Sequence, residues 1–261
     1  MRPPVFLLAL VLLPLLGAGL LLGSGGERRA TAQGTTEGVL VDVKTPARVD
    51  LSPPLREMRG TQSPSPALAM LLDAPSGYEA ALGPQSRDTV AQIEVGGPAP
   101  PPELKLSVDT LPNLAGVVPP DPVGDVGPHH YVAMSNLHFA VYDKEGDLLY
   151  GPQPNNVLWQ GFGGPCETEN AGDPIVLYDQ IDDRWILSQF TILGPEYFNC
   201  VAVSATGDPI GPYHRYAFSN GQVVPDYPKY GLWRDGLYIS TRDYVGTFVT
   251  SFGAYAIDLG D

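Results

Sequence analysis

Short apolar runs separated by turn residues fill the chain from about Glu103 onward. The clearest set is a group of four successive runs in the middle of this region. They span residues 175–178, 185–190, 200–203 and 213–218. Each is four to six residues long and rich in β-branched or aromatic side chains, which is typical of strands rather than helices. The pattern predicts a four-stranded sheet.

The same arrangement recurs loosely three times along the chain. Each copy begins with an Asp next to Gly or Pro, and the three residues are Asp125, Asp173 and Asp226, 48 and 53 positions apart. A period of about 40–50 residues filled with short strands is typical of propeller blades, which cannot bury their faces alone. The predicted fold class is all-β: a partial β-propeller of about three four-stranded blades over residues 104–261.

Three blades are fewer than a closed propeller needs, because known propellers have four or more. The third repeat supplies three strand-like runs, at 229–233, 237–241 and 254–258, and the sequence ends there. Two explanations are open: the sequence is the N-terminal fragment of a longer protein, or several chains assemble to close a ring. We favour the fragment.

The N-terminal residues have the pattern of an export signal. Arg2 precedes an apolar run over residues 5–22, and Ala30-Thr31-Ala32 offers a cleavage site. We therefore predict a signal peptide over residues 1–32, a secreted or cell-surface protein, and no membrane span after cleavage; an uncleaved anchor is the alternative. Residues 33–103 contain several Pro-rich stretches and few aromatics, which predicts a flexible stalk.

The charge of the chain narrows the classes of partner. The formal net charge is −14 at pH 7, and no basic stripe is present that could neutralise phosphates. We therefore do not expect the protein to bind nucleic acid.

The chain has two cysteines, Cys166 and Cys200. In an exported protein such a pair is typical of a structural disulfide, and no CxxC spacing favours a metal site or a redox centre. We expect one disulfide that ties the loop before the run at 175–178 to the sheet of the same repeat.

Several motifs between residues 118 and 245 occur together. They are Pro119-Pro120-Asp121-Pro122-Val123-Gly124-Asp125-Val126-Gly127-Pro128, Gly163-Gly164-Pro165-Cys166-Glu167, Gly172-Asp173-Pro174-Ile175-Val176-Leu177-Tyr178-Asp179 and Pro225-Asp226-Tyr227-Pro228-Lys229. With them the chain resembles a largely uncharacterised family of exported bacterial proteins of sialidase-like β-propeller appearance, whose members are longer. The resemblance implies a propeller fold outside the cell and transfers no catalytic residues. The S-x-D-x-G-x-x-W turn of sialidases is missing, and Asp183-Arg184-Trp185 matches only part of it, which argues against sialidase activity.

The three repeated carboxylates are the first candidate site. If Asp125, Asp173 and Asp226 each begin the innermost strand of a blade, they converge at the mouth of a central channel. Converging carboxylates bind Ca²⁺ or act as general acid and base. Alternatively, each Asp caps a turn by accepting backbone N–H bonds. Tyr227 and Tyr230, near the third Asp, are candidate ligand contacts, against the alternative of packing between sheets.

A second candidate is the acidic loop that precedes the second repeat. Glu167, Glu169, Asn170 and Asp173 place four oxygen-bearing side chains within seven residues, which suits Ca²⁺ but lacks the ordered spacing of a dedicated calcium loop. A solvated surface loop is the alternative.

The sequence predicts a class of function rather than an activity. It contains no G-x-S-x-G elbow, and its four histidines are scattered. The leading hypothesis is a secreted or cell-surface binding module for a glycan or another surface protein. The alternatives are a glycosidase or lyase that uses the convergent Asp residues, and a purely structural surface protein.

Overall fold

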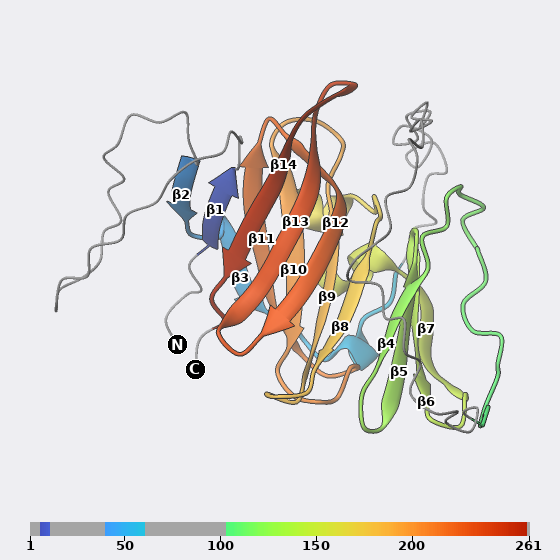
Figure 1. The fold of residues 1–261 in the computed structure, drawn as a ribbon. Coiled ribbons are helices and arrows are strands. Elements are labelled where there is room, and N and C mark those ends of the chain that lie inside the picture. The colour runs from blue at the N-terminus through green and yellow to red at the C-terminus, as the bar shows by residue number, and fades with distance from the viewer. Residues whose placement is uncertain (1–5, 11–39, 61–102, 260–261) are drawn as a thin grey trace, which may run out of the picture.

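The computed structural model describes residues 6–10, 40–60 and 103–259, which form three antiparallel sheets (Figure 1). The first sheet has the order β4-β5-β6-β7, which is also the order of the chain. Its strands are β4 (Val123–Val126), β5 (His130–Ser135), β6 (His138–Asp143) and β7 (Leu148–Pro154). Each strand pairs with the next through a turn, so that the sheet is a simple meander.

The second and third sheets repeat this meander and add strands from the N-terminal part of the chain. The second sheet consists of β8 (Ile175–Asp179), β9 (Arg184–Phe190), β10 (Tyr197–Ser204), β11 (Tyr213–Gly221) and β3 (Arg48–Leu51). The third consists of β12 (Val224–Trp233), β13 (Gly236–Val245), β14 (Phe248–Ile257), β1 (Phe6–Leu10) and β2 (Leu40–Lys44). Three short helices complete the described elements: η1 (Leu55–Glu57), η3 (Asn155–Trp159) and α1 (Pro165–Thr168).

The second sheet is buried on both faces. Along β9, Trp185 and Leu187 belong to one apolar core with the first sheet, whereas Ile186 belongs to another with the third. Strand β10 repeats the division, with Cys200 on the first side and Val201 on the other. Because side chains alternate between the faces of a strand, a continuous apolar run such as that of β9 fits a sheet covered on both sides.

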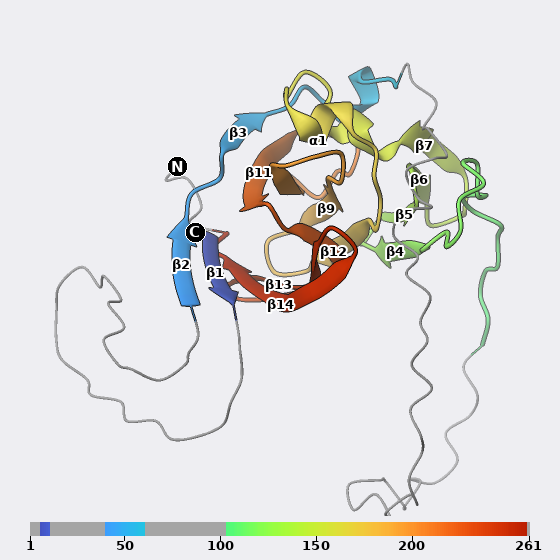
Figure 2. The same ribbon diagram turned by 90° about the horizontal axis from the view of Figure 1, so that it is seen from above.

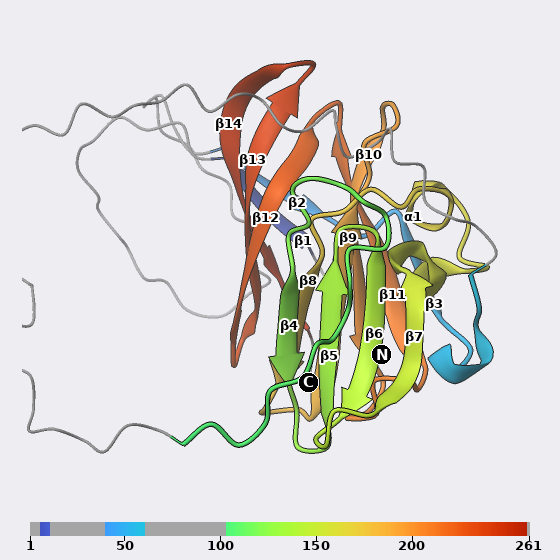
Figure 3. The ribbon, with the colours of Figure 1, turned by 90° about the vertical axis from the view of Figure 1, so that its right-hand side faces the viewer.

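The first strands of the three sheets lie side by side. Strand β8 contacts β4 on one side and β12 on the other, and Figure 2, seen from above, shows the three sheets following one another. A carboxylate joins two of them, since Asp125 Oδ2 accepts the backbone N–H of Tyr178 at 2.7 Å. Figure 3 shows the first sheet in front and the third tilted behind it.

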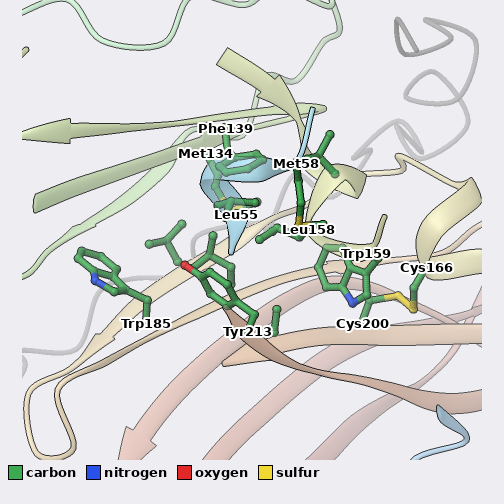
Figure 4. Close-up of a cluster of buried hydrophobic side chains, with 14 of the residues drawn as sticks. Leu55, Met58, Met134, Phe139, Leu158, Trp159, Cys166, Trp185, Cys200 and Tyr213 are labelled. Carbon is green, nitrogen blue, oxygen red and sulfur yellow. A yellow bond between two sulfur atoms is a disulfide. The ribbon is translucent and has the colours of Figure 1, made fainter. Parts of the chain in front are cut away.

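The N-terminal segment 47–58 follows the outer edge of the second sheet. Strand β3 pairs with β11, and Leu55 and Met58 enter the core between the first and second sheets (Figure 4). Arg215 on β11 binds this segment through Asp50. Its side chain is 2 % exposed, its Nε and Nη2 donate to Asp50 at 2.7 and 2.6 Å, and its Nη1 donates to two backbone carbonyls on and just after η3.

The structure confirms the all-β prediction and the disulfide. Cys166 on α1 and Cys200 on β10 are bonded, with their Cα atoms 5.8 Å apart, and Trp159 packs beside them (Figure 4). The described sheets do not close into a ring. Among the described residues no helix is long and apolar enough to cross a membrane.

Strands also occur in segments for which the sequence predicted other states. Strand β3 and helix η1 lie within the predicted flexible stalk, as does β2, and β1 lies within the predicted signal peptide. Apart from residues 40–60 and 103, the stalk lies outside the described residues. The cleavage of the signal concerns the processing of the chain and stays a prediction.

Removing the buried cation should destabilise the fold far more than removing an exposed one. Arg215→Met should lower the free energy of unfolding by about 3–5 kcal/mol, because Asp50 and two carbonyls lose their donor. The matched control is Arg56→Met, which breaks a half-exposed ion pair between η1 and Asp208 and should lower stability by less than about 1 kcal/mol. Urea denaturation measures both, and equal losses would contradict a fastening role for Arg215.

Candidate functional site

Three carboxyl groups influence one another electrostatically where the first strands of the sheets begin. Asp121 lies two residues before β4, Asp173 lies two residues before β8, and Asp226 is the third residue of β12. The Asp173 carboxyl is hydrogen-bonded to that of Asp121 and feels the charge of Asp226. Arg242 on β13 also lies near Asp173. We call Asp121, Asp173, Asp226 and Arg242 the acidic cluster.

The environment of Asp173 favours its protonated form. Burial contributes most, followed by the negative charges of Asp226 and Asp121, and together they raise its pKa to about 7. At neutral pH Asp173 is therefore about half protonated. Its proton lies in the hydrogen bond to Asp121, so the remaining oxygens of the two carboxyl groups act as hydrogen-bond acceptors.

Asp226 is held in an ion pair at the edge of the cluster. Its side chain is 2 % exposed, and its Oδ2 accepts from Arg242 Nε at 2.9 Å and Nη2 at 2.6 Å. Burial raises the pKa of Asp226 although Arg242 opposes the shift. The guanidinium is 39 % exposed and lies near the rings of Tyr227 and Tyr244, 5.5 and 5.2 Å from their centroids. Arg242 and Tyr227 thus form the solvent-facing side of the cluster.

A turn of the first sheet positions Asp121. Asn136, between β5 and β6, donates from Nδ2 to Asp121 Oδ2 at 2.8 Å and to the carbonyl of Pro119 at 3.0 Å. These bonds hold Asp121 at a φ of 39°, which an Asp tolerates better than most residues. Gly172 gives Asn136 its space: it has a φ of 111°, and a Cβ there would lie 2.5 Å from Asn136 Oδ1.

The sequence predicts that Asp125, Asp173 and Asp226 converge, and the structure brings only two of these three carboxyl groups near each other. Asp173 and Asp226 meet, but Asp125 does not join them, because it accepts backbone N–H groups of Val126 and Tyr178 instead. This is the backbone-bonding alternative that the sequence left open. Tyr227 is exposed beside Arg242, whereas Tyr230 packs against the core between the second and third sheets. Tyr227 therefore stays a candidate contact, and Tyr230 takes the packing role.

The predicted calcium ligands have other partners. Glu167 accepts the backbone N–H groups of Gly161 and Gly163, and Glu169 accepts those of Ile192 and Leu193. Asn170 donates to the carbonyl of Leu137, and Asp173 is in the acidic cluster. Within the described part of the chain, no group of three or more His, Cys, Asp or Glu side chains is arranged to hold a metal ion. The structure does not bring these four residues together as a cation site.

Sequence reasoning missed Asp121, Asn136 and Arg242. The sequence did contain a signal for Asp121, since Asp121-Pro122 matches Asp173-Pro174 better than Asp125 does. Counted from Asp121, the spacings become 52 and 53 positions, which are nearly equal. Asn136 and Arg242 carry no such signal: Asn136 reaches Asp121 within the first sheet, and Arg242 lies opposite Asp226 in the β12–β13 hairpin.

Comparison of the chain with models of known protein families, with curated proteins and with solved structures finds no match. The acidic cluster therefore has to be interpreted from its own geometry and chemistry.

Neutralising Asp173 should stabilise the protein at alkaline pH. Its folded pKa of about 7 lies above the unfolded value near 3.9, so the folded state binds the extra proton between these values. The contribution of this group to stability therefore falls as the pH rises from about 4 to about 7. Asp173→Asn mimics the protonated acid. At pH 8 the free energy of unfolding of this variant should exceed that of the unmodified protein by about 1 kcal/mol or more.

The same comparison at pH 4 should show a much smaller difference, since Asp173 is then protonated in the folded state and about half protonated in the unfolded state. Asp147→Asn, in the exposed turn between β6 and β7, is the control and should change stability little at either pH. Thermal melts at the two pH values measure the effect. A loss of stability in Asp173→Asn at pH 8 would show instead that the ionised carboxylate supports the fold.

Proposed function

We propose that the three sheets are successive blades of a β-propeller on an exported binding module. Three features support the blade arrangement: the repeated meander, the contacts of β8 with β4 and β12, and the double burial of the second sheet. In a propeller the first strand of each blade lies nearest the central axis. The acidic cluster would then lie at one mouth of the central channel.

The outer face of the third sheet fits the same proposal. Tyr238 and Phe252 are exposed on it, and Gly231 and Ser240 leave its middle flat, with open space where a Cβ on Gly231 would lie. A face of this kind is suited to covering by a further sheet, as the second sheet is covered by the third.

The observation that carries the binding function is the composition of the acidic cluster. Two neighbouring carboxyl groups, a third carboxyl group in an ion pair and a partly exposed guanidinium together offer several hydrogen-bond acceptors and a few donors in one partly buried place. The cluster holds three carboxyl groups against one guanidinium, which favours ligand groups that donate hydrogen bonds. It therefore suits a ligand that donates several hydrogen bonds, such as the hydroxyl or ammonium groups of a surface glycan or protein.

A second candidate function rests on the pKa of Asp173. A carboxyl group with a pKa of about 7 is matched to general acid catalysis at neutral pH, and ionised carboxylates lie near it. A glycosidase or lyase uses such a pair, with the protonated acid on the leaving oxygen and the carboxylate on the other face of the sugar. Asp173 would be the acid and Asp226 the carboxylate, because Asp121 is hydrogen-bonded to Asp173 and leaves no room for a sugar between them.

A glycan array combined with chromogenic glycosides separates the two functions. The binding module predicts that some array ligands are retained without turnover, and that Asp226→Asn and Asp173→Asn each weaken retention about tenfold or more. Asp147→Asn should bind as the unmodified protein does. Turnover that is lost in Asp173→Asn although its melting temperature is not lowered would favour the enzyme over the binding module. If all variants retain the array ligands equally well, the acidic cluster takes part in neither function.

A further inference from the structure

A groove of about 750 Å³ lies at the opposite end of the same strands. The turn between β8 and β9 forms one wall with Ile181, Asp182 and Arg184, and the turn between β12 and β13 forms the other with Trp233, Arg234 and Asp235. We call it the Trp233 groove. The six residue steps along β8 from Asp173 to Asp179 separate it from the acidic cluster by about 20 Å.

Trp233 supplies an exposed aromatic surface in this groove. It is the last residue of β12, and 68 % of it is exposed, whereas Trp159 and Trp185 are fully buried. A tryptophan is among the largest apolar side chains, and leaving one in water is unfavourable. An exposed tryptophan in the wall of a groove is therefore a candidate ligand contact.

The polar wall of the groove is held rigidly. Asp179 is buried and accepts the backbone N–H groups of Ile181 at 2.9 Å and Asp182 at 3.3 Å, which fixes the turn. Its Oδ2 also accepts from Arg184 Nε at 3.2 Å, and the other end of the guanidinium bonds Asp182. The Asp182 side chain is half exposed. Donors and acceptors thus face the groove in fixed places before any ligand arrives, which lowers the entropic penalty of binding.

The mixture of charges decides which class of ligand fits. A cation would meet Arg184 and Arg234, an anion would meet Asp182, Asp235 and Asp258, and a purely apolar ligand would leave these five side chains without water. A neutral sugar avoids these conflicts, because one face of its ring is covered by C–H groups and its edge carries hydroxyls. The C–H face can stack on an indole, and each hydroxyl can donate to a carboxylate and accept from a guanidinium.

We propose that the Trp233 groove is a binding site for a neutral oligosaccharide. Trp233 stacks on a sugar ring, Asp182 and Asp235 accept from hydroxyl groups, and Arg184 and Arg234 donate to them. The volume lies within the range of about 300–1,000 Å³ that is usual for small-molecule sites. The site shares no residue with the acidic cluster and does not depend on the function proposed for that cluster.

Tryptophan fluorescence of the full chain tests the proposal. The protein is titrated with neutral tetrasaccharides built from glucose, mannose, galactose or N-acetylglucosamine, each up to millimolar concentration. Because Trp233 is the exposed tryptophan, binding should shift its emission to the blue and protect it from acrylamide quenching. At least one tetrasaccharide should produce a saturable change, and its affinity, measured by calorimetry, should fall about tenfold or more in Trp233→Ala and in Asp182→Asn.

Two matched variants complete the test. Phe252→Ala removes an aromatic of equal exposure, 68 %, from the third sheet outside the groove and should bind as the unmodified protein does. Asp173→Asn should also retain saccharide binding, which separates this site from the acidic cluster. The proposal is overturned if no tetrasaccharide binds, if Trp233→Ala binds within twofold of the unmodified protein, or if Phe252→Ala loses as much affinity.

Discussion

The burial of the second sheet on both faces is the constraint on which the rest of the structure depends. Trp185 and Leu187 on one face and Ile186 and Val201 on the other would be exposed to water if either neighbouring sheet moved away. Burying such side chains stabilises a fold by about 1.5–3 kcal/mol each, so both neighbours are held in place. The disulfide ties α1 to β10, the middle strand of the same sheet, and the Arg215–Asp50 pair joins β11 to the edge strand β3.

This packing produces the acidic cluster as a consequence. When the three sheets are stacked, β8 lies between β4 and β12, and the polar residues at the starts of these strands are brought together. Isolated carboxylates in such a place would be unfavourable. In the structure, the raised pKa of Asp173 favours its protonated form, and Arg242 pairs with Asp226. Both features leave polar groups that a ligand can contact, and the proposed function rests on these groups.

The sequence predicted the strands well because their information is local. The residue types in runs such as 185–190 and 200–203 are sufficient to predict strands. The presence of Cys166 and Cys200 as a pair within one repeat was sufficient to predict the disulfide. The partners of each strand at the sheet edge are not local. The segment 48–51 is short and lies among Pro-rich stretches, so only the exposed edge of β11 and the buried Arg215 explain why it is a strand.

The candidate site was predicted less completely for the same physical reason. Asp173 and Asp226 were found because Asp next to Pro marks the start of a repeat, but the choice of Asp125 over Asp121 depended on where β4 begins. A shift of four residues turns a cluster carboxylate into one that bonds the backbone of Tyr178. Arg242 lies opposite Asp226 in the β12–β13 hairpin, and Trp233 faces the turn between β8 and β9 of the second sheet. No spacing in the chain predicts these contacts.

The meeting of the three carboxyl groups is the central claim, and a carboxyl ¹³C NMR titration of the Asp-labelled protein tests it most directly. The resonance that is lost in Asp173→Asn should titrate with a midpoint near pH 7 in the unmodified protein. The midpoint should move down in both Asp226→Asn and Asp121→Asn, because each removes a negative charge beside Asp173. A midpoint near pH 4 that neither variant moves would mean that the carboxyl groups do not meet and that the sheets are stacked in another way.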